Sequence, residues 1–313
     1  ANIAAGGDIE IEKGLAIFAE KKFLDAAKVF EKGSGELAKL GVEISRLFRT
    51  QALRAGIGQD DATTAESIRA LLAENPLDKQ ALRSLAKMLR KAEKLLKQQK
   101  LDKAAAVYTA ATMATGAPES QAAKTREALT LLTESKVAQS EKILASQLKE
   151  TKDSQVLKSA VKSVRSQRLK QEKVFLQKLN RGTELIDSAK GLALSLLIDS
   201  KNRSVKAGLS AIRRQISSSI TKRKPAVLSN LIVAQAYLKQ ASSEQIAAVE
   251  KAAKALTANE LPKAESEFTK LVPEGEGSAQ TIPALAAKHI RALRIQEAKQ
   301  QLASLERSRN VLK

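Results

Sequence analysis

The sequence predicts an all-α protein, built as an array of helical hairpins with a basic central helical region. Good helix formers dominate the 313 residues, whereas Gly (14) and Pro (6) are scarce, so long stretches contain no residue that breaks a helix. Aromatic residues make up only 3% of the chain and Trp is absent, which leaves Leu, Ile, Val and Ala to build the core. Such a core suits close helix packing better than a β-sandwich, which needs alternating β-branched and aromatic residues.

Apolar residues recur with helical spacing almost throughout the chain. We expect helices over residues 9–20, 24–33, 36–55, 62–74, 78–98, 101–114, 119–148, 155–180, 183–200, 203–221, 225–240, 242–257, 261–271 and 283–311. Residues 1–8 are expected to be a flexible lead, because Gly6 and Gly7 disfavour a helix. Pro76 and Pro225 end the helices before them, since the residue preceding a proline avoids the helical conformation.

These breaks divide the chain after the lead into three segments. Helical hairpins are expected over 9–135, a basic helical region over 136–240, and a C-terminal hairpin with a loop at 273–283 and a terminal helix over 241–313. The basic region is expected to form a bundle or a long helical hairpin. Its stretch from Ser135 to Asn180 lacks Gly and Pro, so it could form one long helix or two helices that join near residues 152–154.

Positive charge is concentrated in one third of the chain. Residues 136–240 contain 22 basic and 7 acidic residues, a net charge of +15 out of the total of +20. This exceeds the net charge of about 2–8 that solubility asks of a small domain. A concentrated positive field attracts polyanions, so we expect a surface that binds an acidic partner. A solvated helix surface is the plainer interpretation.

The candidate residues for this surface are the Lys and Arg side chains that recur beside the apolar positions or gather at a helix end. They are Lys158, Lys162, Arg165, Lys170, Lys173, Arg213, Arg214, Lys222, Arg223 and Lys224. The cluster from Arg213 to Lys224 could be a phosphate-contacting corner or a weak look-alike of a nuclear-localisation signal, but an exposed helix end that complements the helix dipole ranks first. The region holds only two aromatic residues, Phe175 and Tyr237, so a platform for stacking bases is not expected. Binding to a membrane surface ranks third, because the amphipathic segments lack Trp and Phe on their apolar side.

One short pattern occurs three times. A large apolar residue is followed three residues later by Ala and seven residues later by an aromatic residue, in Phe23–Phe30, Leu101–Tyr108 and Leu261–Phe268. A further apolar residue, Phe18, Leu96 or Leu256, lies five residues before each start. The Ala lets two helices approach closely, and the aromatic ring one turn later fills the groove between them.

This pattern resembles the second half of a tetratricopeptide repeat. The resemblance implies an α-solenoid that presents a surface to protein partners. The chain lacks the Trp and Leu-Gly pair of the family's first helix, and the three segments do not recur at the 34-residue period of the family. Generic packing of helical hairpins is the alternative explanation.

The residues that most catalytic and metal sites need are missing. The chain has no Cys and one His, so zinc sites of the usual type cannot form, and we expect His289 to be a surface residue. No glycine-rich phosphate loop is present, and acidic residues are expected as solvated partners of Lys, as in Glu93–Lys97. We therefore expect no catalytic residues, no cofactor, no metal and no small-molecule ligand.

The longest apolar run, Gly191–Ile198, is too short for a transmembrane helix, and no signal peptide is visible. A soluble protein of the cell or organelle interior is expected, with processing before Ala1 as an open alternative. The first hypothesis for function is a non-enzymatic scaffold or adaptor, a structural subunit of a larger assembly whose basic central face docks on an acidic protein. The alternative is a sequence-independent protein that binds or packages nucleic acid through its phosphate backbone.

Overall fold

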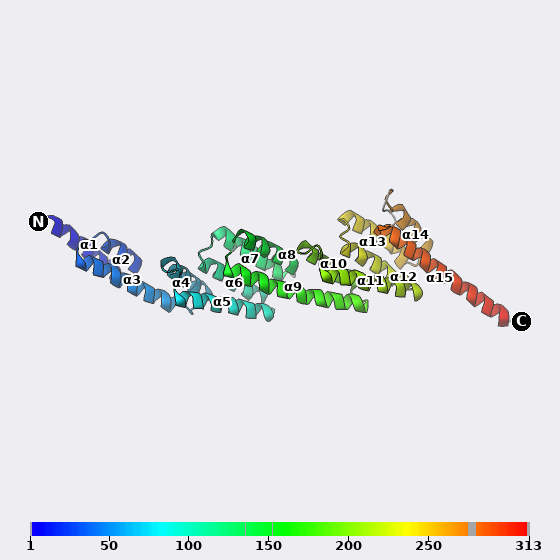
Figure 1. The fold of residues 1–313 in the computed structure, drawn as a ribbon, viewed down its shortest axis with the longest axis horizontal. Coiled ribbons are helices and arrows are strands. Elements are labelled where there is room, and N and C mark those ends of the chain that lie inside the picture. Colours follow the sequence, from blue (N-terminus) through cyan, green and yellow to red (C-terminus); the bar gives the residue numbers. More distant parts are fainter. Residues whose placement is uncertain (1, 135, 152, 275–279, 312–313) are drawn as a thin grey trace. The chain divides into compact units, whose positions relative to one another are not determined.

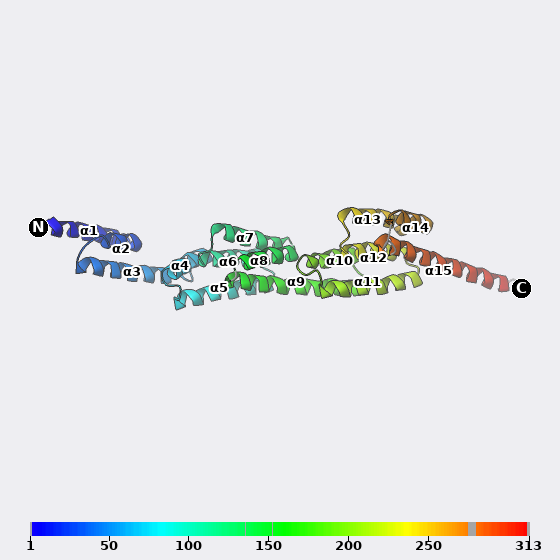
Figure 2. The same ribbon diagram turned by 45° about the horizontal axis from the view of Figure 1, so that its top comes forward.

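Helices are the only regular secondary structure among the described residues of the computed structural model, which are 2–134, 136–151, 153–274 and 280–311 (Figure 1 and Figure 2). The first are α1 (Asn2–Ala19), α2 (Phe23–Phe30), α3 (Glu36–Gly56), α4 (Asp61–Glu74), α5 (Lys79–Lys97), α6 (Leu101–Ala114), α7 (Glu119–Thr133) and α8 (Val137–Glu150). The others are α9 (Gln155–Arg181), α10 (Leu185–Leu194), the 3-10 turn η1 (Ser195–Leu197), α11 (Arg203–Thr221), α12 (Pro225–Leu238), α13 (Ser243–Thr257), α14 (Leu261–Lys270) and α15 (Ile282–Val311). The all-α prediction is confirmed.

Several predicted helix boundaries are wrong. Helix α1 begins at Asn2 rather than at residue 9, because a Gly inside a helix costs only about 1 kcal/mol relative to Ala and does not by itself stop the helix. The expected helix over 119–148 is two helices, α7 and α8. The amide of Lys136 donates to the carbonyl of Leu131, five residues back, at 2.8 Å, which is the hydrogen bond that closes a helix rather than continues it.

The break between α8 and α9 falls where the sequence offered it as one alternative. Helix α8 ends at Glu150, and α9 begins at Gln155. The hydroxyl of Ser154 accepts a hydrogen bond from the amide of Leu157 at 3.3 Å, so Ser154 satisfies a free amide in the first turn of α9. Helix α10 also ends earlier than the predicted residue 200, because the chain tightens into η1. None of the helices described is long and apolar enough to cross a membrane.

The three repeated segments begin their helices at equivalent residues and follow the same turn. The second residue of each turn, Lys21, Gln99 or Asn259, has a left-handed backbone with φ of 60–62°. In each turn the next amide donates five residues back, from Lys22 to Ile17, from Lys100 to Leu95 and from Glu260 to Ala255, at 2.9–3.3 Å. These are the hydrogen bonds of a Schellman motif, which satisfies the last carbonyls of the preceding helix.

A fourth turn of the same kind joins α11 to α12. Arg223 has the left-handed backbone, with φ of 50°, and the amide of Lys224 donates to Ser219 at 2.9 Å. The buried residues that follow are Leu228 and Ile232, in the places that Ala and the aromatic residue take in the other three segments. The turn is therefore shared by hairpins that the sequence pattern does not include.

The chain forms two compact units. Unit 1 comprises Ala1–Lys136 and Ile143–Ser163, and unit 2 comprises Val137–Lys142 and Val164–Lys313. In unit 1, α2 packs on α1 and α3, and α6 packs on α4, α5 and α7. In each hairpin the small residue of the pattern, Ala26 or Ala104, is fully buried.

Glycine supplements alanine where three helices of unit 1 meet around Phe30. A Cβ atom at Gly41 of α3 would lie 2.7 Å from the Phe30 ring, and one at Gly14 of α1 would lie 2.5 Å from it. The ring is buried and cannot move aside. Both helices therefore touch Phe30 with bare backbone, which is why this aromatic residue fits between them.

We expect Gly41→Ala to lower the free energy of unfolding by about 1–2 kcal/mol. Overpacking a core costs about 1–3 kcal/mol, and the better helix propensity of Ala returns up to about 1 kcal/mol. Urea denaturation of the single variant and of Gly41→Ala/Phe30→Leu checks the cause. The glycine substitution should cost less when Leu replaces the ring, and equal costs in both backgrounds would place the strain elsewhere.

Unit 2 is organised around α12. This helix packs on α10, α11, α13 and α15, and its sequence is apolar on nearly every side, as expected for a helix surrounded by others. One apolar core joins it to Phe268 of α14 and to Ile290 and Leu293 of α15. The core thus includes residues on both sides of position 240, where the sequence analysis divides its second and third segments.

Candidate polyanion-binding surface

Helix α9 carries eight basic residues and a single acidic residue, Glu172. The basic candidates Lys158, Lys162, Lys170 and Lys173 are all exposed. Glu172 is only 2% exposed. Every exposed charge on α9 is therefore positive, because its one carboxylate is directed into the protein.

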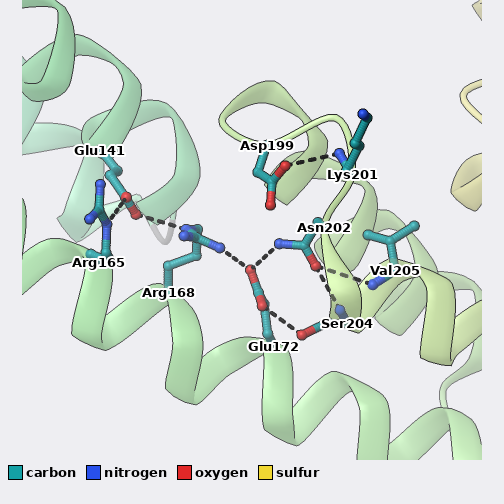
Figure 3. A network of polar contacts seen from close by, with 9 residues as sticks. All are labelled: Glu141, Arg165, Arg168, Glu172, Asp199, Lys201, Asn202, Ser204 and Val205. Carbon is teal, nitrogen blue, oxygen red and sulfur yellow. Dashed lines mark hydrogen bonds and ion pairs between the residues drawn. The ribbon is translucent and has the colours of Figure 1, made fainter.

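Glu172 is held in a buried polar network of unit 2 (Figure 3). The Arg168 guanidinium bridges two carboxylates: its Nε donates to Glu141 at 2.7 Å, and its Nη1 pairs with Glu172. Glu172 also accepts hydrogen bonds from the Asn202 amide at 3.1 Å and from the Ser204 hydroxyl at 2.7 Å. Three helices, α8, α9 and α11, are joined through these groups.

The network is balanced in charge. Glu141 is fully buried and takes a second ion pair, at 2.9 Å, from Arg165, whose side chain is about half exposed. Two carboxylates thus face two guanidinium groups. Burial alone would lower the pKa of Arg168, but the hydrogen bonds and charges of Glu141 and Glu172 raise it above its usual value. A buried cation fixed in this way has a structural role and no proton to give.

The same network fixes the start of α11. The Asn202 side-chain oxygen accepts from the amides of Ser204 and Val205 at 2.8 and 3.2 Å, while its amide group donates to Glu172. Asn202 is therefore both the N-cap of α11 and a link to α9. Figure 3 shows these groups converging between the two helices.

The end of α9 is fixed to α11 by a second set of contacts. Gln215 of α11 donates to the carbonyls of Asn180 and Leu179 at 2.8 and 3.3 Å, and Arg214 donates to the Asn180 side chain at 3.1 Å. The carbonyls at a helix end lack partners within the helix, so Gln215 acts as a cap from outside. Glu172 meets Ser204, and Asn180 meets Arg214, so the part of α9 in unit 2 runs parallel to α11.

Helix α11 has four basic residues and no acidic residue. Of these, Arg203 and Lys206 did not stand out in the sequence, yet both are exposed beside the predicted Arg213 and Arg214. Their spacing of three and seven residues on one helix was the signal that could have found them. Arg181 at the end of α9 is a further exposed basic residue.

The structure places the predicted residues of α9 in unit 2 and those of α11 on two adjacent helices. Arg165, Lys170 and Lys173 lie on one of two adjacent helices, and Arg213 and Arg214 lie on the other. Lys222, Arg223 and Lys224 are exposed in the turn after α11. Lys158 and Lys162 belong to unit 1. We call the exposed basic side chains of unit 2 on α9 and α11 the basic surface: Arg165, Lys170, Lys173, Arg181, Arg203, Lys206, Arg213 and Arg214.

Most of these charges have no internal partner. Within the described ranges, no ion pair of 4.0 Å or less reaches Lys170, Lys173, Arg203, Lys206 or Arg213. Arg165 differs, because it is already tied to Glu141. On the basic surface, the Arg165 guanidinium is therefore already ion-paired, whereas the other five cations named here have no ion-pair partner within the described ranges.

His289 of α15 is half-buried rather than on the open surface, and burial followed by the charge of Lys288 lowers its pKa. Among the residues that the structure describes, no three His, Asp or Glu side chains are grouped to hold a metal ion. Phe175 packs against Gly191, and the Tyr237 hydroxyl donates to Glu250, so the two aromatic residues of the basic region are engaged in packing.

No known protein family, curated protein or solved structure matches this chain.

Proposed function

We propose that this chain is a non-enzymatic scaffold, in which stacked helical hairpins present the basic surface to an acidic protein partner. The observation that carries the proposal is the separation of charge. The acidic residue of α9 is buried in an internal network, α11 has none, and two adjacent helices are left with cations alone. A surface of one sign steers and selects partners of the other sign.

The hairpins support a scaffold role. At least four turns between described helices share one hydrogen-bonding pattern, and three of them belong to the repeated segments whose sequence resembles tetratricopeptide repeats. Arrays of such hairpins hold extended surfaces rigidly for protein partners. We propose that the hairpins of each unit stack in this way.

Charge reversal on the basic surface tests the proposal. The triple variant Lys170→Glu/Lys173→Glu/Arg213→Glu should bind the acidic partner about 10- to 100-fold more weakly, because each reversal replaces an attraction by a repulsion. Its matched control, Lys87→Glu/Lys94→Glu/Lys254→Glu, changes the net charge equally at exposed residues of α5 and α13 and should bind like the unmodified chain.

The measurement is a pull-down from nuclease-treated native lysate, read by quantitative mass spectrometry. A fixed set of acidic proteins that the control retains and the triple variant loses supports the proposal. Equal recovery by both variants would show that the basic surface is not the dock. Loss of all bound material on nuclease treatment would favour the second candidate, a binder of nucleic-acid backbone.

A further inference from the structure

Helix α3 exposes a row of large apolar side chains that its own unit does not cover. Leu37, Leu40, Ile44 and Leu47 are between 39% and 67% exposed. A different face of α3, with Ala38, Gly41 and Ser45, packs against the rest of unit 1. The four exposed residues follow a spacing of three, four and three, which is the spacing of a coiled-coil seam.

Helix α15 carries a row with the same spacing. Leu293 is the last fully buried residue of this helix up to residue 307, and the helix continues to Val311. Beyond Leu293, Ile295, Leu302 and Leu305 are between 51% and 68% exposed, and Ala298 is also exposed. The positions 295, 298, 302 and 305 have the same offsets as 37, 40, 44 and 47, so both rows extend over the same length of helix.

We propose that copies of the chain associate head to tail, with the apolar row of α15 from one copy packed along the apolar row of α3 of the next. The apolar side chains of each row have the spacing that lets them pack between those of the other row. Packing of this kind removes both rows from water. A second copy is the favoured occupant, because this one chain carries two matching rows at different sites. Such an interface is heterologous, so its repetition adds one copy after another and gives either an open filament or a closed ring.

One small residue, Ala298, lets the two rows approach closely. Ala298 falls between Ile295 and Leu302 in the row of α15. All four residues of the row on α3 have branched side chains. An Ala in one helix leaves room for a larger side chain of its partner. Pairing of α3 with itself would bring large residues together at every layer, and it would leave the row of α15 uncovered.

Variants at each end test this arrangement by sedimentation velocity on the full chain. The head variant is Leu40→Lys/Ile44→Lys, and the tail variant is Leu302→Lys/Leu305→Lys. The unmodified chain should show masses above that of one 33.7 kDa chain, rising with concentration up to about 100 µM. Each variant alone should associate at least about 100-fold more weakly, since two buried apolar side chains are lost.

The mixture of the two variants gives the decisive result. The head variant keeps an intact α15 and the tail variant keeps an intact α3, so an equimolar mixture should form pairs and nothing longer. Self-association of the tail variant alone would show that α3 pairs with itself and would overturn the proposal. A monomeric unmodified chain at about 100 µM, or a mixture that stays monomeric, would overturn it as well.

Two controls separate this seam from loss of folding and from the basic surface. The matched control Leu82→Lys/Leu194→Lys changes exposed leucines outside both rows and should associate like the unmodified chain. All variants should keep the same helical content by circular dichroism, because every substituted side chain is exposed. Association should persist at high salt and in the triple variant of the basic surface, since an apolar seam is not screened.

Discussion

Replacing Arg168 with methionine should lower the free energy of unfolding by about 3 kcal/mol. Breaking a buried ion pair costs about 3–5 kcal/mol, because the partner charge is left in a poorly solvated place. The lower end applies here, since Arg165 stays on Glu141, and Asn202 and Ser204 stay on Glu172. Urea denaturation followed by circular dichroism measures the loss.

The control for this prediction is Arg165→Met, on the same helix and with the same partner. Arg165 is about half exposed, and removing it should cost no more than about 1 kcal/mol. A second comparison, Glu141→Gln/Arg168→Met/Glu172→Gln, removes all the charges of the buried core of the network and should recover most of the lost stability. A loss that the triple variant does not recover would mean that the Arg168 side chain stabilises by packing and not by its charge.

The network also explains a property of the surface above it. A carboxylate on α9 would ordinarily face solvent and offset the lysines around it. Here Glu172 is taken inward by Arg168 and Asn202, so the same contacts that hold α9 on α11 leave the exposed face without a negative charge. Stability and surface charge are therefore coupled through one side chain.

Local signals in the sequence were enough to predict the helices but not the way in which distant residues meet. Helices α6 and α11 begin and end at the predicted residues, because turn and capping residues mark both ends of each. The split between α7 and α8 was missed, since no Gly or Pro marks it and the N-cap of α8, Lys136, makes no capping hydrogen bond with its side chain. The closing hydrogen bond of Lys136 is made by backbone atoms, which any residue could supply.

The candidate surface likewise contains residues that the sequence predicts and contacts that it does not. The exposed cations follow from helical spacing and net charge, so the sequence could propose most of them. The Arg168–Glu172 pair is also visible as neighbours four residues apart, but Glu141 lies 27 residues from Arg168 and Asn202 lies 30 residues from Glu172. Glu93 is a further contact that the sequence did not predict. It accepts a hydrogen bond from Ser159, 66 residues away, and not from the nearby Lys97.

Truncating Tyr108 to alanine should cost about 3–5 kcal/mol of stability, which is the usual range for a buried aromatic residue. Tyr108 is the aromatic residue of the second repeated segment and is fully buried. Its hydroxyl donates to Ser163 at 3.2 Å and lies 3.3 Å from the Ser159 hydroxyl. Tyr108→Phe keeps the ring and should lose only about 0.5–1.5 kcal/mol, so the difference between the two variants measures the packing of the ring.

The pH dependence of the Tyr108→Phe comparison tests whether the hydroxyl is buried in solution. Burial raises the pKa of Tyr108 above its usual 10.0, so the folded chain holds this proton to higher pH than the unfolded chain does. Its contribution to stability is therefore complete below about pH 10 and is lost as pH rises through the folded pKa. The stability advantage of the unmodified chain over Tyr108→Phe should stay constant from about pH 8 to pH 9 and should shrink as the pH rises from about 10 to 11. An advantage that does not change over this range would mean that the hydroxyl reaches solvent and that the close contact between α6 and α9 is not maintained.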